Sequence, residues 1–156
     1  MFNVMDLDNN VKGYIGEEIA SHFINKRIRC KRFQPDIIND YSISDTQKEF
    51  LRKNWKYLDI IRFNDNIQKM EIYEVKSRKY VPSRKPIWNK HAISPFVLNI
   101  YELAIKLNMD VKIFEILFYK DWNFSYIIKQ FDKKHFSISK TRGQGSNYKN
   151  YFLNKK

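Results

Sequence analysis

Apolar residues recur at four-residue intervals in one stretch near the start of the chain, at Val11, Ile15, Ile19 and Phe23. This spacing is typical of an amphipathic helix, and it predicts one over residues 11 to 25 with Asn9 or Asn10 as its cap. On that helix Glu17 borders the apolar face, whereas Glu18 points nearly away from it. We therefore expect Glu17 to face the protein and Glu18 to face water.

Two segments, residues 57 to 63 and 70 to 76, are rich in Ile, Tyr, Phe and Val, a composition that favours strands. With them, five segments are strand candidates. They cover residues 29 to 33, 57 to 63, 70 to 76, 111 to 119 and 124 to 131, the last of which could equally begin as a helix. The second and third segments flank the turn-rich sequence Asn64-Asp65-Asn66. We expect these two segments to form an antiparallel hairpin.

Two further helices are predicted between the strands. Residues 44 to 56 indicate a polar, exposed helix within a stretch, about 39 to 56, that has the character of an insertion. Ser94-Pro95 is a strong helix start, and this helix should end near Asn108. Its expected buried face consists of Phe96, Ile100, Leu103, Ala104 and Leu107.

The order of these elements is helix, strand, inserted segment, hairpin, helix and hairpin. This order predicts an α/β fold in which a mixed β-sheet is flanked by helices. A chain of 156 residues has the usual size of one domain, so we expect a single domain over residues 1 to 156.

The predicted hairpin brings two acidic residues together. If it turns between residues 66 and 67, Phe63 pairs with Met70, and the same register puts Asp59 opposite Glu74. Directly opposed side chains in antiparallel strands have Cβ atoms about 4.5 to 5.5 Å apart, and like charges at that distance are destabilising. A bound divalent cation would relieve the repulsion.

Glu74 and Lys76 share one face of their strand, because residues two apart project to the same side. Carboxylate oxygens suit Mg²⁺, which keeps several waters and can also bind a substrate phosphate. Lys76 could then orient or deprotonate the nucleophile, or stabilise the transition state. The pattern is consistent with phosphodiester hydrolysis, although solvated strand faces without catalytic function are also commonly charged.

Basic residues exceed acidic ones by a wide margin: 29 Lys and Arg against 17 Asp and Glu give a net charge of +12. Such an excess favours a polyanionic partner or an anionic membrane surface. Residues 77 to 92 should form an irregular loop that contacts nucleic acid. The side chains expected to do so are Arg78, Lys79, Arg84, Lys85 and Lys90. Residues 133 to 156 are predicted to form a basic tail.

Other features narrow the class of protein. No apolar run approaches the roughly 18 residues of a membrane-spanning helix, and the first residues lack the order of a signal peptide, so we expect a cytoplasmic, intracellular protein with no membrane partner. Cys30 is the single cysteine, and the spacing of His22, His91 and His135 does not indicate zinc. Any metal should therefore be held mainly by oxygen.

Two groups of residues resemble a known family. Asp59-Ile60-Ile61, followed by Glu74-Val75-Lys76, is similar to the bipartite signature of the PD-(D/E)XK nuclease superfamily. Gly16-Glu17-Glu18-Ile19-Ala20 is similar to the Gly-Glu-x-x-Ala helix that precedes this signature in Holliday junction resolvase-like proteins and their predicted-endonuclease relatives. The similarity covers about residues 11 to 119.

The resemblance implies a restriction-endonuclease-like fold with an α-β-β-β-α-β core. It implies that Asp59, Glu74 and Glu17 ligate Mg²⁺ or Mn²⁺ and that Lys76 is catalytic. It also implies an endonuclease that acts on nucleic acid, with DNA and branched or repair intermediates as the first expectation, and often a homodimer.

This sequence departs from the family pattern in two places. The literal Pro-Asp pair is Pro35-Asp36, but Asp36 lies too far before Glu74 to face it through a short hairpin, whereas Asp59 can. The second departure is the inserted stretch from about 39 to 56. Two other functions therefore stay open: a non-catalytic nucleic-acid-binding module, and an accessory subunit that docks on a larger nucleoprotein complex.

Overall fold

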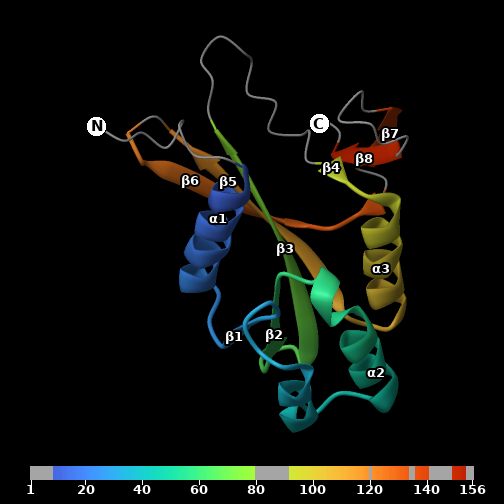
Figure 1. Ribbon diagram of the computed structural model, residues 1–156. Helices are drawn as coiled ribbons and strands as arrows, with labels where there is room; N and C mark the ends of the chain where they lie inside the picture. The colour runs from blue at the N-terminus through green and yellow to red at the C-terminus, as the bar shows by residue number, and fades with distance from the viewer. Residues whose placement is uncertain (1–8, 80–91, 120, 134–135, 141–148, 154–156) are drawn as a thin grey trace.

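The computed structural model describes residues 9–79, 92–119, 121–133, 136–140 and 149–153. Its larger sheet has five strands in the order β1-β2-β3-β5-β6 (Figure 1). Their bounds are Arg27–Arg29 for β1, Ile60–Asn64 for β2, Lys69–Lys79 for β3, Asp110–Phe118 for β5 and Phe124–Gln130 for β6. Neighbouring strands are antiparallel except β3 and β5, which are parallel. The expected mixed sheet is thus confirmed, and the segment that could have begun as a helix is the strand β6.

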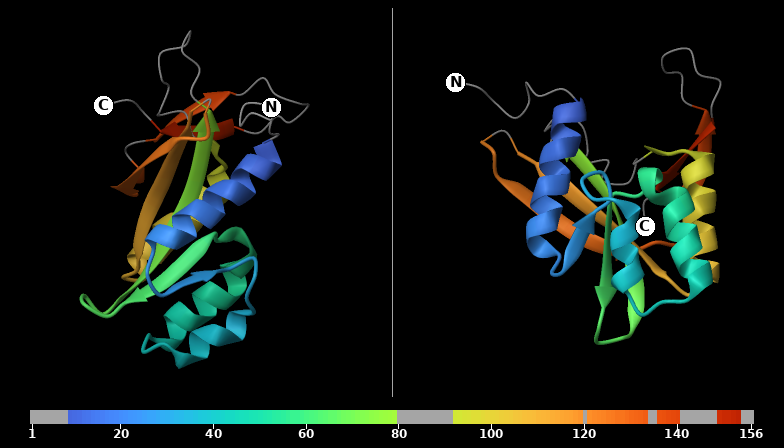
Figure 2. Two further views of the ribbon diagram at one scale, coloured as in Figure 1. Left: turned by 90° about the vertical axis from the view of Figure 1, so that its left-hand side faces the viewer. Right: turned by 60° about the horizontal axis from the view of Figure 1, so that its bottom comes forward.

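Helices cover both faces of this sheet. In the described part of the chain the α-helices are α1 (Asn9–Phe23), α2 (Asp45–Asn54) and α3 (Pro95–Lys106). α1 lies on one face, and α2 and α3 lie on the other (Figures 1 and 2). Strand alternation explains this division: Tyr73 and Phe114 pack with α1, whereas Ile72 and Ile113 belong to the larger core under α2 and α3. The α/β architecture with flanking helices is confirmed.

The contact between α1 and β3 depends on a glycine. A Cβ atom at Gly16 would overlap Ser77 Oγ and crowd Ser77 Cβ. Because only glycine lacks that atom, the helix can approach β3 this closely. Glu17 follows Gly16 and is buried, whereas Glu18 is exposed, as the helical pattern predicts.

α3 supplies the crossover between the two parallel strands, which a tight turn cannot join. It begins as predicted: Ser94 Oγ accepts a hydrogen bond from the Val97 N–H at 3.3 Å, and proline follows the cap. The predicted buried face is wrong in part, since Phe96 and Leu103 are exposed. The residues of α3 that are buried are Leu98, Ile100, Tyr101 and Ala104. The helix packs on the sheet through the side that carries Tyr101.

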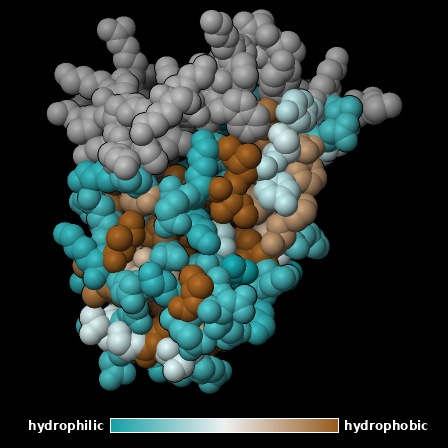
Figure 3. Space-filling view, turned by 180° about the vertical axis from the view of Figure 1, so that it is seen from behind, coloured by the Kyte–Doolittle hydropathy of each residue, from teal (hydrophilic) through white to brown (hydrophobic). Residues whose placement is uncertain are grey.

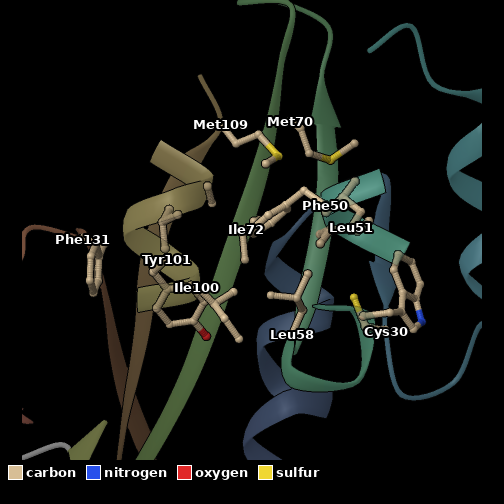
Figure 4. Close-up of a cluster of buried hydrophobic side chains, with 14 of the residues drawn as sticks. Cys30, Phe50, Leu51, Leu58, Met70, Ile72, Ile100, Tyr101, Met109 and Phe131 are labelled. Carbon is tan, nitrogen blue, oxygen red and sulfur yellow. The ribbon is translucent and has the colours of Figure 1, made fainter. Parts of the chain in front are cut away.

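The stretch predicted as an exposed insertion contributes to the core. α2 begins with a capping box in which Ser44 and Gln47 exchange side-chain hydrogen bonds with each other's backbone. Phe50 and Leu51 are buried and lie beside Ile72 on β3 (Figure 4). The remaining elements here are the short 3₁₀ helices η2 (Pro35–Asp40) and η3 (Trp55–Tyr57). α2 is therefore packed against the core, and the expectation of an exposed helix is corrected.

Two predicted boundaries and the predicted C-terminal tail also need correction. The first strand lies at Arg27–Arg29 instead of residues 29 to 33, because Arg32 N–H turns back to the Arg29 carbonyl. β3 continues to Lys79, so residues 77 to 79 are strand and not loop. The predicted basic tail contains β7 (Phe136–Lys140) and β8 (Lys149–Leu153), which form a three-stranded sheet with β4 (Ala92–Ile93) in the order β4-β8-β7.

The surface combines polar and apolar regions. Figure 3 shows patches of hydrophobic residues between hydrophilic ones on the described part of one face. None of the helices in the described ranges is both long and apolar enough to cross a membrane.

Candidate active site

The β2–β3 hairpin has the register that its sequence predicts, with Phe63 opposite Met70. Asp59 directly precedes β2, and the same register continued by one residue puts it opposite Glu74. The Asp59 carboxylate reaches across to β3, where its Oδ2 accepts a hydrogen bond from the Val75 N–H at 2.9 Å. This bond holds the carboxylate against β3, beside Glu74.

Glu74 is a buried carboxylate with a partner on each oxygen. Its Oε1 lies 2.8 Å from the ammonium of Lys76, which projects from the same face of β3. Its Oε2 accepts a hydrogen bond from the hydroxyl of Tyr101. Tyr101 comes from α3 and is fully buried, and Figure 4 shows its ring between α3 and β3. The crossover helix thus fixes the orientation of Glu74.

Glu17 joins the site through a lysine that the sequence pattern did not single out. The Lys31 ammonium lies 2.5 Å from Glu17 Oε1 and 3.1 Å from Asp59 Oδ1. On its other side, Glu17 Oε2 lies 3.5 Å from the guanidinium of Arg29, which also pairs with Glu18. These contacts join Glu17 to Asp59 through Lys31 and Glu74 to Lys76, and the hydrogen bond from the Val75 N–H to Asp59 connects the two pairs.

Burial dominates the electrostatics of Glu74. It raises the pKa of the Glu74 carboxyl to about 7; the Lys76 ammonium opposes the rise and the Asp59 carboxylate adds to it. The pKa of Lys76 is raised, although burial alone would lower it. The attraction of Glu74 outweighs the cost of burial. Lys76 is therefore an ammonium at neutral pH.

Glu71, three residues earlier on β3, is a second buried carboxylate whose pKa can be compared with that of Glu74. It is completely buried, and its hydrogen-bond donors are Arg62, Asn64, Tyr73 and Lys112. Burial opposes ionisation, yet these donors lower the pKa of Glu71 to about 2. Two carboxylates on one strand thus have opposite pKa shifts, because hydrogen-bond donors outweigh burial at Glu71 and burial outweighs the Lys76 ammonium at Glu74.

The raised pKa of Glu74 predicts a specific pH dependence of stability without metal. Between the ordinary carboxyl pKa and about 7, the folded protein holds a proton that the unfolded chain has lost. The free energy of unfolding in EDTA should therefore fall as the pH rises through that window, by about 3 kcal/mol at most. The fall should be absent in Glu74→Gln and retained in Glu102→Gln, a carboxylate paired with Lys133 at the surface. Urea denaturation at pH 5 and pH 8 measures it, and equal profiles for wild type and Glu74→Gln would contradict it.

The arrangement of carboxylates suits a partly hydrated divalent ion. Within the described ranges, no three Asp, Glu, His or Cys side chains converge closely enough to hold a metal by themselves. Glu17 Oε1 and Asp59 Oδ1 nevertheless share one cation, the Lys31 ammonium. Mg²⁺ commonly takes one or two protein carboxylates and completes its shell with water and phosphate. Glu17 Oε1 and Asp59 Oδ1 are therefore the two oxygens that could hold a hydrated Mg²⁺ or Mn²⁺.

No protein-family model matches this chain, and no curated protein matches it. The literal Pro35-Asp36 pair does not contribute, because Asp36 lies exposed on η2. Cys30 is buried, and burial raises the pKa of its thiol, which agrees with a passive packing role.

The predicted nucleic-acid contacts are described only in part. Arg78 and Lys79 lie on β3 and not in a loop, and as neighbours on a strand they project to opposite faces. Arg78 shares the face of Lys76. Arg84, Lys85 and Lys90 lie outside the described residues.

A further carboxylate lies near the site. Glu115 on β5 is in register with Lys76 and is completely buried. The ammonium of Lys129 lies 3.2 Å from its Oε1. Glu115 sits within an apolar strand sequence, where only the parallel register of β3 and β5 relates it to Lys76, so the local pattern could not identify it.

Proposed function

We propose that this protein is a metal-dependent nuclease with a restriction-endonuclease-like fold, which hydrolyses phosphodiester bonds in nucleic acid, with DNA as the expected substrate. The observation that carries the proposal is the meeting of Asp59 and Glu74 across one hairpin, beside the ammonium of Lys76. Glu17 from α1 adds a third buried carboxylate. Carboxylate oxygens gathered in this way suit a divalent cation such as Mg²⁺.

Each residue of the site would have a role that follows from its chemistry. When bound, the metal would supply an activated water and neutralise charge on the phosphate. Asp59 and Glu17 would hold it, and Glu74, kept in place by Tyr101, would complete the site. Lys76, whose pKa is raised by the neighbouring Glu74, would act as an ammonium and not as a base towards water. Its role would be to stabilise the negative charge that develops on the phosphate.

A specific observation favours the rival function of a non-catalytic binding module. Lys31 and Lys76 already neutralise the carboxylates, so the fold does not require a metal. A module of this kind, or an accessory subunit, would use the net charge of +12 to bind nucleic acid without cutting it.

A panel of substrates separates the two functions. The protein should be incubated with linear duplex, single-stranded and four-way-junction DNA, and with RNA of the same sequence, in Mg²⁺ and in EDTA. The proposal expects cleavage products with at least one DNA substrate in Mg²⁺ and none in EDTA. Stable binding to every substrate with no product in Mg²⁺ or Mn²⁺ would favour the binding module.

A further inference from the structure

The Lys31 ammonium contacts the two carboxylate oxygens that would bind a metal, one from Glu17 and one from Asp59. It lies 2.5 Å from Glu17 Oε1 and 3.1 Å from Asp59 Oδ1. The other oxygens of these carboxylates have partners of their own, since Asp59 Oδ2 accepts from the Val75 N–H and Glu17 Oε2 faces Arg29. A divalent ion that binds Glu17 and Asp59 through the oxygens facing each other therefore competes directly with Lys31.

The two basic residues around Glu17 differ in how firmly they are held. The side chain of Arg29 is only 8% exposed and pairs with Glu17 and Glu18. The side chain of Lys31 is 48% exposed. Moving a half-exposed ammonium into water costs less than removing a buried guanidinium from its partners, because the ammonium is already partly hydrated. Of these two cations, Lys31 is therefore the easier one to displace.

The carboxylates need a cation in either state. Glu17 and Asp59 are 7% and 9% exposed, and like charges at short range in a buried site repel strongly. Without metal the ammonium supplies the compensating charge. A divalent ion supplies twice that charge at the same oxygens, so the carboxylates no longer need the Lys31 ammonium for compensation.

From these contacts we infer that Lys31 is an exchangeable internal cation: it occupies the Glu17–Asp59 position without metal, and a divalent ion displaces its ammonium into solvent. The inference rests on the proposed metal site. It makes Lys31 a residue that sets metal affinity by competition, in contrast to Lys76, whose partner Glu74 is nearly fully buried.

Two measurements test this inference without using activity. The first is the affinity for Mn²⁺, followed through the free-ion paramagnetic resonance signal, for wild type, Lys31→Gln and Lys26→Gln. Lys26 is the matched control, since it pairs with Asp65 at the surface. Lys31→Gln should bind Mn²⁺ about tenfold more tightly, which corresponds to about 1.4 kcal/mol, and Lys26→Gln should match wild type.

The second measurement uses only the wild-type protein, so it does not depend on the folding of a variant. The rate of amine labelling at Lys31, followed by mass spectrometry, should rise severalfold on addition of Mg²⁺, while labelling at Lys26 should not change. This readout reports the release of the ammonium itself.

The outcomes distinguish the inference from the proposed function. Saturable Mn²⁺ binding by wild type, with equal or weaker binding by Lys31→Gln, overturns the exchange and leaves the metal site intact. Unchanged labelling of Lys31 at saturating Mg²⁺ also overturns it. No saturable binding by either protein overturns the proposed metal site, and the exchange with it.

Discussion

Replacing Lys76 with alanine is expected to lower the rate of metal-dependent cleavage by about 100- to 1000-fold, the size of effect seen when one preorganised charge-stabilising group is removed. The physical reason is that Lys76 stays charged at neutral pH beside the buried Glu74. The loss should appear under single-turnover conditions, with DNA binding in EDTA, measured by fluorescence anisotropy, within a few-fold of wild type.

Lys26→Ala provides the control for the loss of one positive charge, because Lys26 lies in an exposed ion pair with Asp65. It should cleave at the wild-type rate. A Lys76→Ala protein that cleaves as fast as Lys26→Ala would remove Lys76 from the mechanism.

Two substitutions of Asp59 are expected to separate its catalytic role from its structural one. Asp59→Asn keeps an oxygen that can accept from the Val75 N–H but loses the negative charge, so cleavage should fall by about 100-fold or more, beyond the 10- to 100-fold effect typical of outer partners of a metal site. Asp59→Ala also leaves that N–H without its acceptor. It should cost about 1 to 3 kcal/mol of stability in addition.

Urea denaturation in EDTA measures the stability difference, and single-turnover cleavage measures the catalytic one. Asp110→Asn and Asp110→Ala are matched controls, because Asp110 pairs with Lys69 at the start of β5. If Asp59→Asn retains full cleavage, Asp59 is not a metal ligand. If Asp59→Ala is as stable as Asp59→Asn, the hydrogen bond to Val75 does not support the hairpin.

The parts of the site that local rules govern could be predicted from the sequence. Two-residue alternation relates Glu74 to Lys76, and a short hairpin has few registers, so Asp59 opposite Glu74 follows from the turn. Helical periodicity likewise separates buried Glu17 from exposed Glu18. Each of these relations joins residues within one element or one hairpin.

The residues that the sequence did not identify are those that depend on contacts between distant elements. Lys31 reaches Glu17 and Asp59 over 14 and 28 residues of chain, from a short segment after β1. Tyr101 faces Glu74 because the buried side of α3 overlaps only in part with the side that its apolar residues predict. Phe96 and Leu103 are apolar but exposed on that helix, so the apolar pattern did not indicate that Tyr101 is buried.

The inserted stretch gives the same lesson about packing. The polar composition of residues 44 to 56 predicts an exposed helix, yet Phe50 and Leu51 are enough to anchor it in the core. Gln47 adds a hydrogen bond from its side chain to the Leu107 carbonyl at 2.7 Å, which ties α2 to the end of α3. A few apolar positions on a polar helix can therefore decide its burial.

The most direct test of the proposed nuclease site is the metal dependence of single-turnover DNA cleavage by wild type beside Glu74→Ala. Protein concentrations should be high enough that both bind the substrate fully. The proposed site predicts product from wild type in Mg²⁺, none from wild type in EDTA and none from Glu74→Ala in Mg²⁺. Cleavage by Glu74→Ala at the wild-type rate, or cleavage that persists in EDTA, would contradict it.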